Sequence, residues 1–363
     1  MSKLPEAIVK LLENITISAW VLDGCQNIVF MNRFMQDLFG DLTGSNASLI
    51  YECTSFEAVG TARADSGGFT EMIIADVPFR RLNCDLDLGP EGRFNVEFFE
   101  DKSEEKLIRN NMAVALAKIS AETKMAKTIQ KSILPVDDTY WNTIAFNSLY
   151  MPADDLGGDF YDVVKLNDDE FLIYIADVSG HGIQASLLTI FMSERVRANS
   201  ESALAGTGVL LSKLVHDFSA LDIDNALYIT MVICKYSKSR QELSISNAGH
   251  NCFPLIIRNN GRTETIPTRG IPVCMLAEGE YYDEETVGMK PGDRLVLFTD
   301  GIIEEVDNTT GRSFGAEGVR RLAVEYHAFD GSFLASKIIE ESARYALISA
   351  KDDRTILVAD ILS

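Results

Sequence analysis

Acidic residues stand at four places in the chain where a β-strand is expected to begin or end. These places read GGDFYD at 157–162, DVSGHG at 177–182, TDG at 299–301 and DDRT at 352–355. Three of the four carry glycine beside the acid. A single Asp-Gly pair usually marks a turn, so the prediction of a shared site depends on the four places together.

The chemistry that suits such a set is the binding of divalent cations. Carboxylates at the ends of buried strands are unfavourable unless they are paired or coordinate a metal. Two carboxylates about 4 Å apart repel by roughly 4 kcal/mol at an effective dielectric constant near 20. Oxygen ligands without a His or Cys partner favour hard ions, Mg²⁺ or Mn²⁺. Neighbouring glycines let the backbone pass close to the ions, so that carbonyl groups and waters complete their shells.

The elements that must position these acids can be read from the apolar pattern. Two acidic places follow almost continuously apolar segments, 171–176 and 294–298, which we interpret as fully buried strands. Further strands are expected at 227–236, 242–246, 252–258 and 355–361, and helices at 183–198, 209–218 and 333–345. Because strands and helices follow no regular βαβ order, we predict an α+β fold with two packed sheets covered by helices.

Six motifs in a fixed order connect these elements with a known superfamily. They are GGDFYD, DVSGHG, NAGHN, PGDRLVLFTDGIIEEVDN, FGAEGV and DDRT, preceded by IQKSILP. Over about residues 125–361 they resemble the phosphatase-2C-like (PPM) superfamily, in particular the bacterial branch of the stage II sporulation and stress-response sigma-regulation phosphatases. The resemblance implies an αββα sandwich, two packed antiparallel sheets flanked by helices, at 135–363. It also implies a metal-dependent protein serine/threonine phosphatase.

The resemblance assigns metal-binding roles to five residues. Asp177 is expected to be the central catalytic ligand that bridges two Mn²⁺ or Mg²⁺ ions, and Val178 to offer its backbone carbonyl to one of them. Asp159 is expected to hold the second ion mainly through waters, and Asp300 and Asp352 to bind the first. A water bridging the ions would become hydroxide and attack a phosphoserine or phosphothreonine in line.

Further polar residues of these motifs have less defined roles. Asp353 stands where many relatives carry Asn, and we expect it to orient the outer coordination shell or to help bind a third ion. His181, four residues after Asp177, is a candidate proton donor to the leaving oxygen; the alternative is that it caps or shapes the loop before the next helix. His250 is expected to be a structural histidine in a turn. The remaining histidines, His216 and His327, are also expected to be structural.

Residues 1–100 are predicted to form a separate small α+β domain. Strands are expected at 17–22 and 28–30, joined by the Asp23-Gly24 turn, and a short helix at 34–39 should end at Gly40. The phrase AWVLDGCQNIVFMNRFMQDLFG resembles a PAS sensor domain. A GAF-like or another small α+β module is the alternative.

Residues 101–134 are predicted to form one long helix because they contain neither Gly nor Pro. Spacings of alternating four and three positions indicate a coiled coil that makes a parallel homodimer, interrupted at Glu122. The alternative is an amphipathic helix packed on its own domain. We call the following residues the seam: Ile108, Met112, Ala115, Ile119, Ala126, Ile129 and Ile133.

Composition limits the function further. The 363 residues carry a formal net charge of −21, which argues against a nucleic-acid partner because phosphate backbones require a basic surface. No apolar run approaches the roughly 18 residues of a membrane helix, and the N-terminus lacks the pattern of a secretory signal. Six scattered cysteines without a CxxC pair suggest reduced thiols in a cytoplasmic protein.

Together these observations predict a sensor-regulated phosphatase. The resemblance implies that its substrate is a phosphorylated anti-sigma factor antagonist (STAS-type) in a bacterial partner-switching pathway. An activating protein or ligand would act at the N-terminal domain, and the helices expected at 183–198 and 209–218 would be the switch beside the metal site. The alternative is a catalytically silent or activator-dependent signalling scaffold of the same fold.

Overall fold

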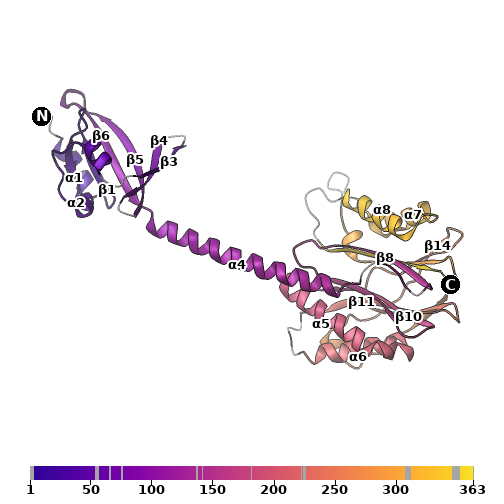
Figure 1. Ribbon diagram of the computed structural model, residues 1–363. Coiled ribbons are helices and arrows are strands. Elements are labelled where there is room, and N and C mark those ends of the chain that lie inside the picture. The colour runs from indigo at the N-terminus through magenta and orange to yellow at the C-terminus, as the bar shows by residue number, and fades with distance from the viewer. Residues whose placement is uncertain are drawn as a thin grey trace. The chain divides into compact units, whose positions relative to one another are not determined.

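The computed structural model divides the chain into two compact units, residues 1–119 and 120–363 (Figure 1). It describes residues 4–53, 57–64, 67–74, 77–135, 138–140, 142–180, 182–221, 223, 226–306, 312–345 and 352–362. Among these residues, no helix is both long enough and apolar enough to cross a membrane.

The first unit is a six-stranded antiparallel sheet with helices on both faces. Its strand order is β2-β1-β6-β5-β4-β3. Met35 of α2 packs on one face and Leu12 of α1 on the other. The PAS-like assignment and the domain boundary at residue 100 stay predictions. Its elements are α1 (Glu6–Glu13), β1 (Ser18–Leu22), β2 (Ile28–Met31), α2 (Arg33–Phe39), α3 (Ala47–Cys53), β3 (Glu57–Ala64), β4 (Gly67–Ile74), β5 (Val77–Asp87) and β6 (Arg93–Asp101).

The turn from the first hairpin into α2 has a clear local cause. Asn32 is fully buried, and its side-chain oxygen accepts hydrogen bonds from the backbone N–H groups of Ala19 and Met35, so it caps α2 and anchors β1. Gly40 ends the helix with a φ of 74°, a conformation that favours glycine. The sequence predicted this end of the helix at Gly40.

Helix α4 (Ser103–Ile133) is a single helix of 31 residues, as predicted for this segment. Its seam side chains Ile108, Met112 and Ile119 are each more than half exposed. Within α4, which the structure describes throughout, the one buried residue is Gln130. The coiled-coil pairing itself stays a prediction.

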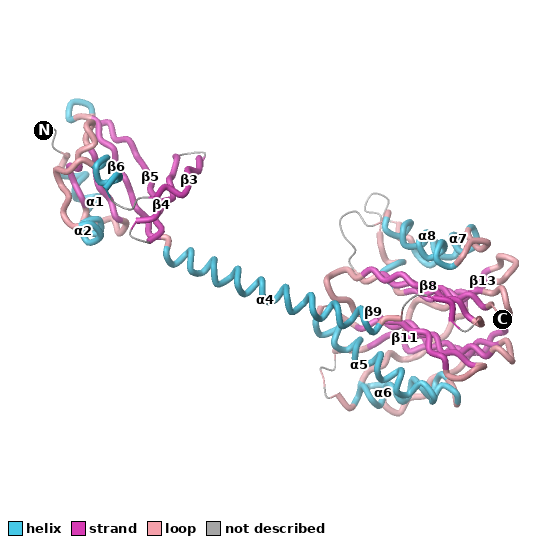
Figure 2. Tube along the Cα trace, viewed as in Figure 1, coloured by secondary structure: helices cyan, strands magenta, loops and turns pink. Residues whose placement is uncertain are grey.

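The second unit consists of two antiparallel sheets packed face to face, with helices α5 and α6 outside one sheet and α7 and α8 outside the other (Figure 2). The sheets have the orders β15-β12-β11-β10-β9 and β14-β13-β16-β17-β8-β7. This arrangement confirms the predicted αββα sandwich. The strands are β7 (Asp138–Tyr140), β8 (Ile144–Met151), β9 (Asp159–Lys165), β10 (Glu170–Val178), β11 (Ile229–Ser237), β12 (Glu242–Ala248), β13 (Leu255–Ile257), β14 (Thr263–Thr265), β15 (Glu285–Gly288), β16 (Arg294–Phe298) and β17 (Arg354–Ile361). The helices are α5 (Ile183–Asn199), α6 (Thr207–Ser219), α7 (Gly315–Glu325) and α8 (Gly331–Ala343).

Strand β10 is apolar from Phe171 to Ala176 because both of its faces are covered there. Leu172, Tyr174 and Ala176 belong to the core under α5 and α6, whereas Ile173 and Ile175 belong to the core between the two sheets. Since successive side chains of a strand point to opposite faces, the odd-numbered positions of β10 face the second sheet.

One predicted strand is shorter than expected. The segment 252–258 was predicted as a strand, but β13 covers only Leu255–Ile257. Pro254 immediately precedes it and has no N–H group to donate to a sheet ladder, which limits the strand on that side.

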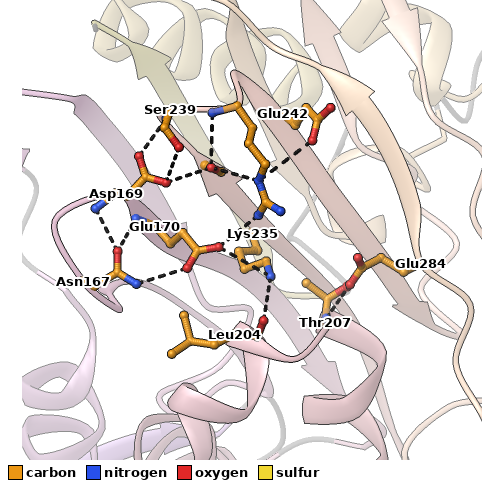
Figure 3. A network of polar contacts seen from close by, with 11 residues as sticks. Asn167, Asp169, Glu170, Leu204, Thr207, Lys235, Ser239, Glu242 and Glu284 are labelled. Atoms are coloured by element: carbon orange, nitrogen blue, oxygen red, sulfur yellow. Dashed lines mark hydrogen bonds and ion pairs between the residues drawn. The ribbon is translucent and has the colours of Figure 1, made fainter.

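A polar network stabilises the sheet β15-β12-β11-β10-β9 at the end where β10 begins (Figure 3). Lys235, only 5% exposed, lies 3.7 Å from Glu170 and 3.5 Å from the carbonyl of Leu204.

The start of α6 belongs to the same region. Its N-cap residue, Gly206, has no capping side chain, and Glu284 instead accepts hydrogen bonds from the N–H and the hydroxyl of Thr207 at 2.6 and 2.8 Å.

We predict that Glu284→Ala lowers the free energy of unfolding by about 1–2 kcal/mol, because the first turn of α6 loses its acceptor. Urea denaturation of the full chain measures this. Glu285→Ala, which removes the exposed neighbouring carboxylate, is the matched control and should change stability by less than about 0.5 kcal/mol. Equal effects of the two substitutions would contradict the capping role.

Candidate metal centre

Strand pairing brings the first two predicted acids directly opposite each other. β9 and β10 run antiparallel in a register that pairs Asp159 with Asp177. Both lie on the faces that carry Tyr161 and Ile175 into the core between the sheets. The two carboxylates are therefore neighbours at the edge of the space between the two sheets.

The other predicted acids come to the same place from the opposite sheet. β16 pairs with β17, so the residues after Phe298 lie beside the residues before Ile356. Asp300 begins a short 3₁₀ turn directly after β16, and Asp352 precedes β17. The structure thus brings together four strand ends that are far apart in the sequence.

Asp159 is held by hydrogen bonds from the opposite sheet. It is 1% exposed, and its Oδ2 accepts bonds from the hydroxyls of Thr299 at 2.8 Å and Thr355 at 2.5 Å. Thr299 in turn accepts a bond from the backbone N–H of Thr355 at 3.0 Å. Sequence reasoning missed both threonines, since nothing in their local sequence marks them as partners of an acid so distant along the chain.

Asp353 has a positioning role in this structure. Its carboxylate accepts hydrogen bonds from the N–H groups of Ala153 at 2.8 Å and Gly158 at 2.5 Å, with that of Asp159 more distant at 3.4 Å. Both carboxylate oxygens are therefore engaged with the loop that leads into β9. This geometry supports the predicted role in organising the surroundings of the ions.

Three glycines allow the chain segments to approach one another at the site. A Cβ atom at Gly157 would stand 2.1 Å from the hydroxyl of Tyr150. One at Gly158 would stand 2.7 Å from the carbonyl oxygen of Val178, and one at Gly301 would stand 2.1 Å from a backbone oxygen. Because no larger residue fits at these positions, the glycines allow the backbone to pass close to the acidic residues, as expected from the sequence, and Gly158 in particular lies against the Val178 carbonyl.

The electrostatics of the site show a concentration of uncompensated negative charge. Burial raises the pKa of Asp177 to about 8, with further contributions from Asp300, Asp352, Asp353 and Glu304. Burial also raises the pKa of Asp159, with Asp177 and Asp353 adding to the effect. The pKa of Asp352 is raised by burial and by nearby Asp300.

This donor set fits divalent cations. The charged neighbours that raise these pKa values are themselves carboxylates, so hard cations would stabilise the whole group. Among the residues that the structure describes, no three His, Cys, Asp or Glu side chains are arranged as a metal site by themselves. A complete shell would therefore include waters and a backbone carbonyl, as expected for Asp159 and Val178.

Glu304 is an acidic neighbour to which the sequence analysis assigned no role. Its N–H donates to the carbonyl of Asp300 at 2.8 Å, and this turn places it among the carboxylates around Asp177. The next residue, Glu305, forms a buried ion pair with Arg354 at 2.7 Å. The pair joins the chain after Asp300 to the start of β17.

His250 is a satisfied structural histidine, as predicted. Its Nε2–H donates to the carbonyl of Phe298 at 3.0 Å, and its Nδ1 accepts from the hydroxyl of Thr230 at 2.9 Å. Burial lowers its pKa, which keeps the ring neutral. Because Thr230 pairs with Asp177 across the sheet, His250 connects the strand ends that carry Asp177 and Asp300.

Two further histidines, His216 and His327, make their polar contacts away from the acidic residues. His216 is largely exposed and lies 3.5 Å from Glu278, and Nδ1 of His327 lies 2.9 Å from the carbonyl of Val324. Both positions agree with a structural role. His181 lies outside the described residues, so its proposed role as proton donor stays a prediction.

Comparison with known proteins identifies the family of the chain. The family model described as "Stage II sporulation protein E (SpoIIE)" matches residues 167–362. The chain is 22% identical to "Phosphoserine phosphatase RsbU" of Bacillus subtilis (strain 168) over 242 residues, which cover 66% of this chain and 70% of that protein. It is 24% identical to "Phosphoserine phosphatase RsbP" of the same organism over 185 residues, half of this chain and 45% of that relative's length.

A solved structure supports the fold. The "SiaA-PP2C domain of Pseudomonas aeruginosa" superposes with a TM-score of 0.60 at 21% identity, covering 69% of this chain and 100% of that domain. At this identity the likeness concerns the fold alone, and it agrees with the two packed antiparallel sheets described above.

We predict that the stability of the metal-free protein falls as the pH rises from about 5 to 8. The carboxyl of Asp177 has its pKa raised to about 8 in the folded state, against an ordinary value of about 3.9 in an unfolded chain. Between these pH values the folded state keeps a proton that the unfolded state releases, so a higher pH favours unfolding. Urea midpoints measured in the presence of a chelator report this slope.

Asp177→Asn should flatten the slope and raise the midpoint near pH 8, because the amide carries no charge to repel its neighbours. Asp168→Asn, which changes a fully exposed carboxylate, is the control and should keep the wild-type slope. A slope that is the same in all three proteins would show that the acids around Asp177 do not repel one another as the structure indicates.

Proposed function

The chain belongs to the stage II sporulation protein E family, and from this premise we propose that it is a metal-dependent protein serine/threonine phosphatase. The observation that carries the proposal is the convergence of Asp159, Asp177, Asp300 and Asp352 on one edge of the space between the sheets. Their mutual repulsion suits two Mn²⁺ or Mg²⁺ ions. When bound, such ions lower the pKa of a water and stabilise charge on phosphate oxygens.

The residues of this chain would hold the ions and fix their surroundings. Asp177, at the centre of the carboxylates, would bridge both ions with help from the carbonyl of Val178. Asp300 and Asp352 would complete the first ion's set, and Asp159 would reach the second through waters. The threonine hydroxyls on Asp159 and the backbone bonds on Asp353 keep these two carboxylates in one orientation.

The leaving oxygen of the serine or threonine also requires a proton. His250 is unsuited to donate it because both of its ring nitrogens are engaged in buried hydrogen bonds. His181 remains the candidate proton donor.

For the substrate, we propose a phosphoserine on a small signalling protein, an anti-sigma factor antagonist of the STAS type in a partner-switching pathway. The support is the sequence resemblance together with two relatives that are named phosphoserine phosphatases. The chain matches less than half of the length of RsbP. The proposal therefore does not rest on the substrate of that whole protein.

For the regulation, we propose that a PAS-like domain at 1–100 receives a signal from a ligand or an activating protein. Helix α4 would carry it as a parallel homodimer at 101–134. The exposed seam residues Ile108, Met112 and Ile119 support this, because apolar side chains at alternating spacings of four and three are those that a partner helix covers in a coiled coil.

The phosphatase proposal predicts that hydrolysis of a phosphoserine protein by the full chain requires Mn²⁺ or Mg²⁺. Asp177→Ala should lower kcat/KM by at least roughly 10²–10³-fold, since the central ligand is lost. Asp168→Ala, in which an exposed carboxylate is removed, should retain wild-type activity. Full activity of Asp177→Ala would refute the assignment, and partner binding without metal binding in the wild type would favour the scaffold.

The dimer proposal predicts that Met112→Glu shifts the full chain towards monomer in sedimentation experiments, because a carboxylate at a seam position opposes pairing. Val114→Glu is the matched control, since Val114 is 71% exposed but lies off the seam. A monomeric wild type, or equal behaviour of both variants, would be evidence against the seam as the dimer contact.

A further inference from the structure

Gln130 stands out in helix α4 because it is 4% exposed, whereas the other residues of the helix are exposed or half-buried. Its side-chain amide contacts two elements of the phosphatase domain. The Nε2 donates to the carbonyl of Gly157 at 2.6 Å and to the hydroxyl of Thr189 in α5 at 3.1 Å. The Oε1 accepts a bond from the N–H of Gly157 at 3.3 Å.

The two bonds with Gly157 involve both backbone groups of one residue. A side chain that satisfies them must offer a donor and an acceptor together at this length. Glutamine does so, whereas a carboxylate lacks the donor and an apolar side chain lacks both. Unsatisfied, these buried backbone groups would cost roughly 1–3 kcal/mol each, so the loop would rearrange instead.

Gly157 is next to the residues that present Asp159. Gly158 donates its backbone N–H to the carboxylate of Asp353 at 2.5 Å, and Asp159 follows as the first residue of β9. Gln130 and Asp353 therefore hold successive residues of one short loop from two sides. Displacing Gly157 changes where Asp159 meets the opposite sheet.

The end of α4 is anchored to the same elements by a second contact. Arg197 of α5 donates to the carbonyl of Ile133 at 2.9 Å and to Asp162 of β9 at 2.8 Å. Leu134 packs against the core under α5 and α6 and also against the core between the two sheets of the second unit. The last turn of α4 is thus placed relative to β9 and α5, and a rotation of the helix would move Gln130.

The seam and this docked face overlap. Ala126 and Ile133 belong to the seam, yet both are half-buried in the structure, whereas Ile129 between them is exposed. The interruption of the seam at Glu122 therefore separates a part at 108–119 with a regular exposed stripe from a part at 126–133 that docks on its own domain.

We propose that Gln130 is a positioning residue that couples the rotation of α4 to metal binding by setting the loop before Asp159. The metal part of this proposal rests on the proposed function, whereas the coupling to the loop does not. In this role Gln130 would touch no reacting group. It acts through Gly157.

The test compares the full-length wild type with Gln130→Leu. Hydrogen exchange of the metal-free protein should become faster at 157–159 in the variant, and the affinity for Mn²⁺ measured by calorimetry should fall about tenfold. Saturating Mn²⁺ should largely restore kcat, because the variant lacks no reacting group. Lys131→Leu, which changes the exposed neighbouring residue, should resemble the wild type in every readout.

Thr189→Val separates the two contacts of Gln130. It removes the bond to α5 and leaves both bonds to Gly157, so Mn²⁺ affinity should stay within about twofold of the wild type. A loss as large as that of Gln130→Leu would overturn the route through Gly157. Should Gln130→Leu fail to fold, Gln130→Glu, which keeps the acceptor but loses the donor, is measured in its place with the same expected direction.

Wild-type exchange at 157–159 and wild-type Mn²⁺ affinity in the Gln130 variant would overturn the proposal. If the wild type itself binds no Mn²⁺, the proposed function fails, and exchange alone decides the coupling. Faster exchange at 157–159 would then support the control of the loop by Gln130, and unchanged exchange would refute it.

Discussion

The candidate site depends on the burial of the Asp159 carboxylate between two sheets. A buried carboxylate without partners costs several kcal/mol. Here two threonine hydroxyls from the opposite sheet donate to it, and hydrogen bonds to charged groups contribute about 1.5–3 kcal/mol each. The bonds also join the sheets at the edge where Asp177, Asp300 and Asp352 arrive. One side chain thereby links the packing of the sandwich to the geometry of the acids.

The same burial creates the repulsion that suits the site to cations. Desolvation and neighbouring carboxylates both disfavour the charged form of Asp177, so without cations the fold is stabilised by keeping it protonated. Divalent ions reverse this balance, because the charged form then has the stronger partners. The glycines at 157, 158 and 301 are needed for the same reason, since a side chain at any of them would hold the acidic loops apart.

The sequence was sufficient to predict the acids at the strand ends and the two-sheet fold, because both depend on local patterns. The segments 171–176 of β10 and 295–298 of β16 are apolar on both faces, and an acid stands at or just after the end of each strand. Helix α7 was not predicted, since its Gly318 weakens the local helix preference and is explained only by the ring of Phe314 against it. Thr299, Thr355 and Glu304 were missed because their role depends on contacts made by the fold. A hydroxyl beside Asp159 from a residue 196 positions away leaves no local signal.

Gln130 belongs to the motif IQKSILP, but its role could be recognised only from contacts made in the fold. The chemistry of its amide explains why a neutral side chain suits the position. A cation beside Gly157 would lie close to Asp353 and Asp159 and would compete with metal ions for them. An anion would add to a repulsion that is already large. An amide satisfies the backbone of Gly157 and leaves the charge of the site unchanged. Contact between α4 and the loop can therefore change the position of Asp159 without changing the charge that attracts the ions.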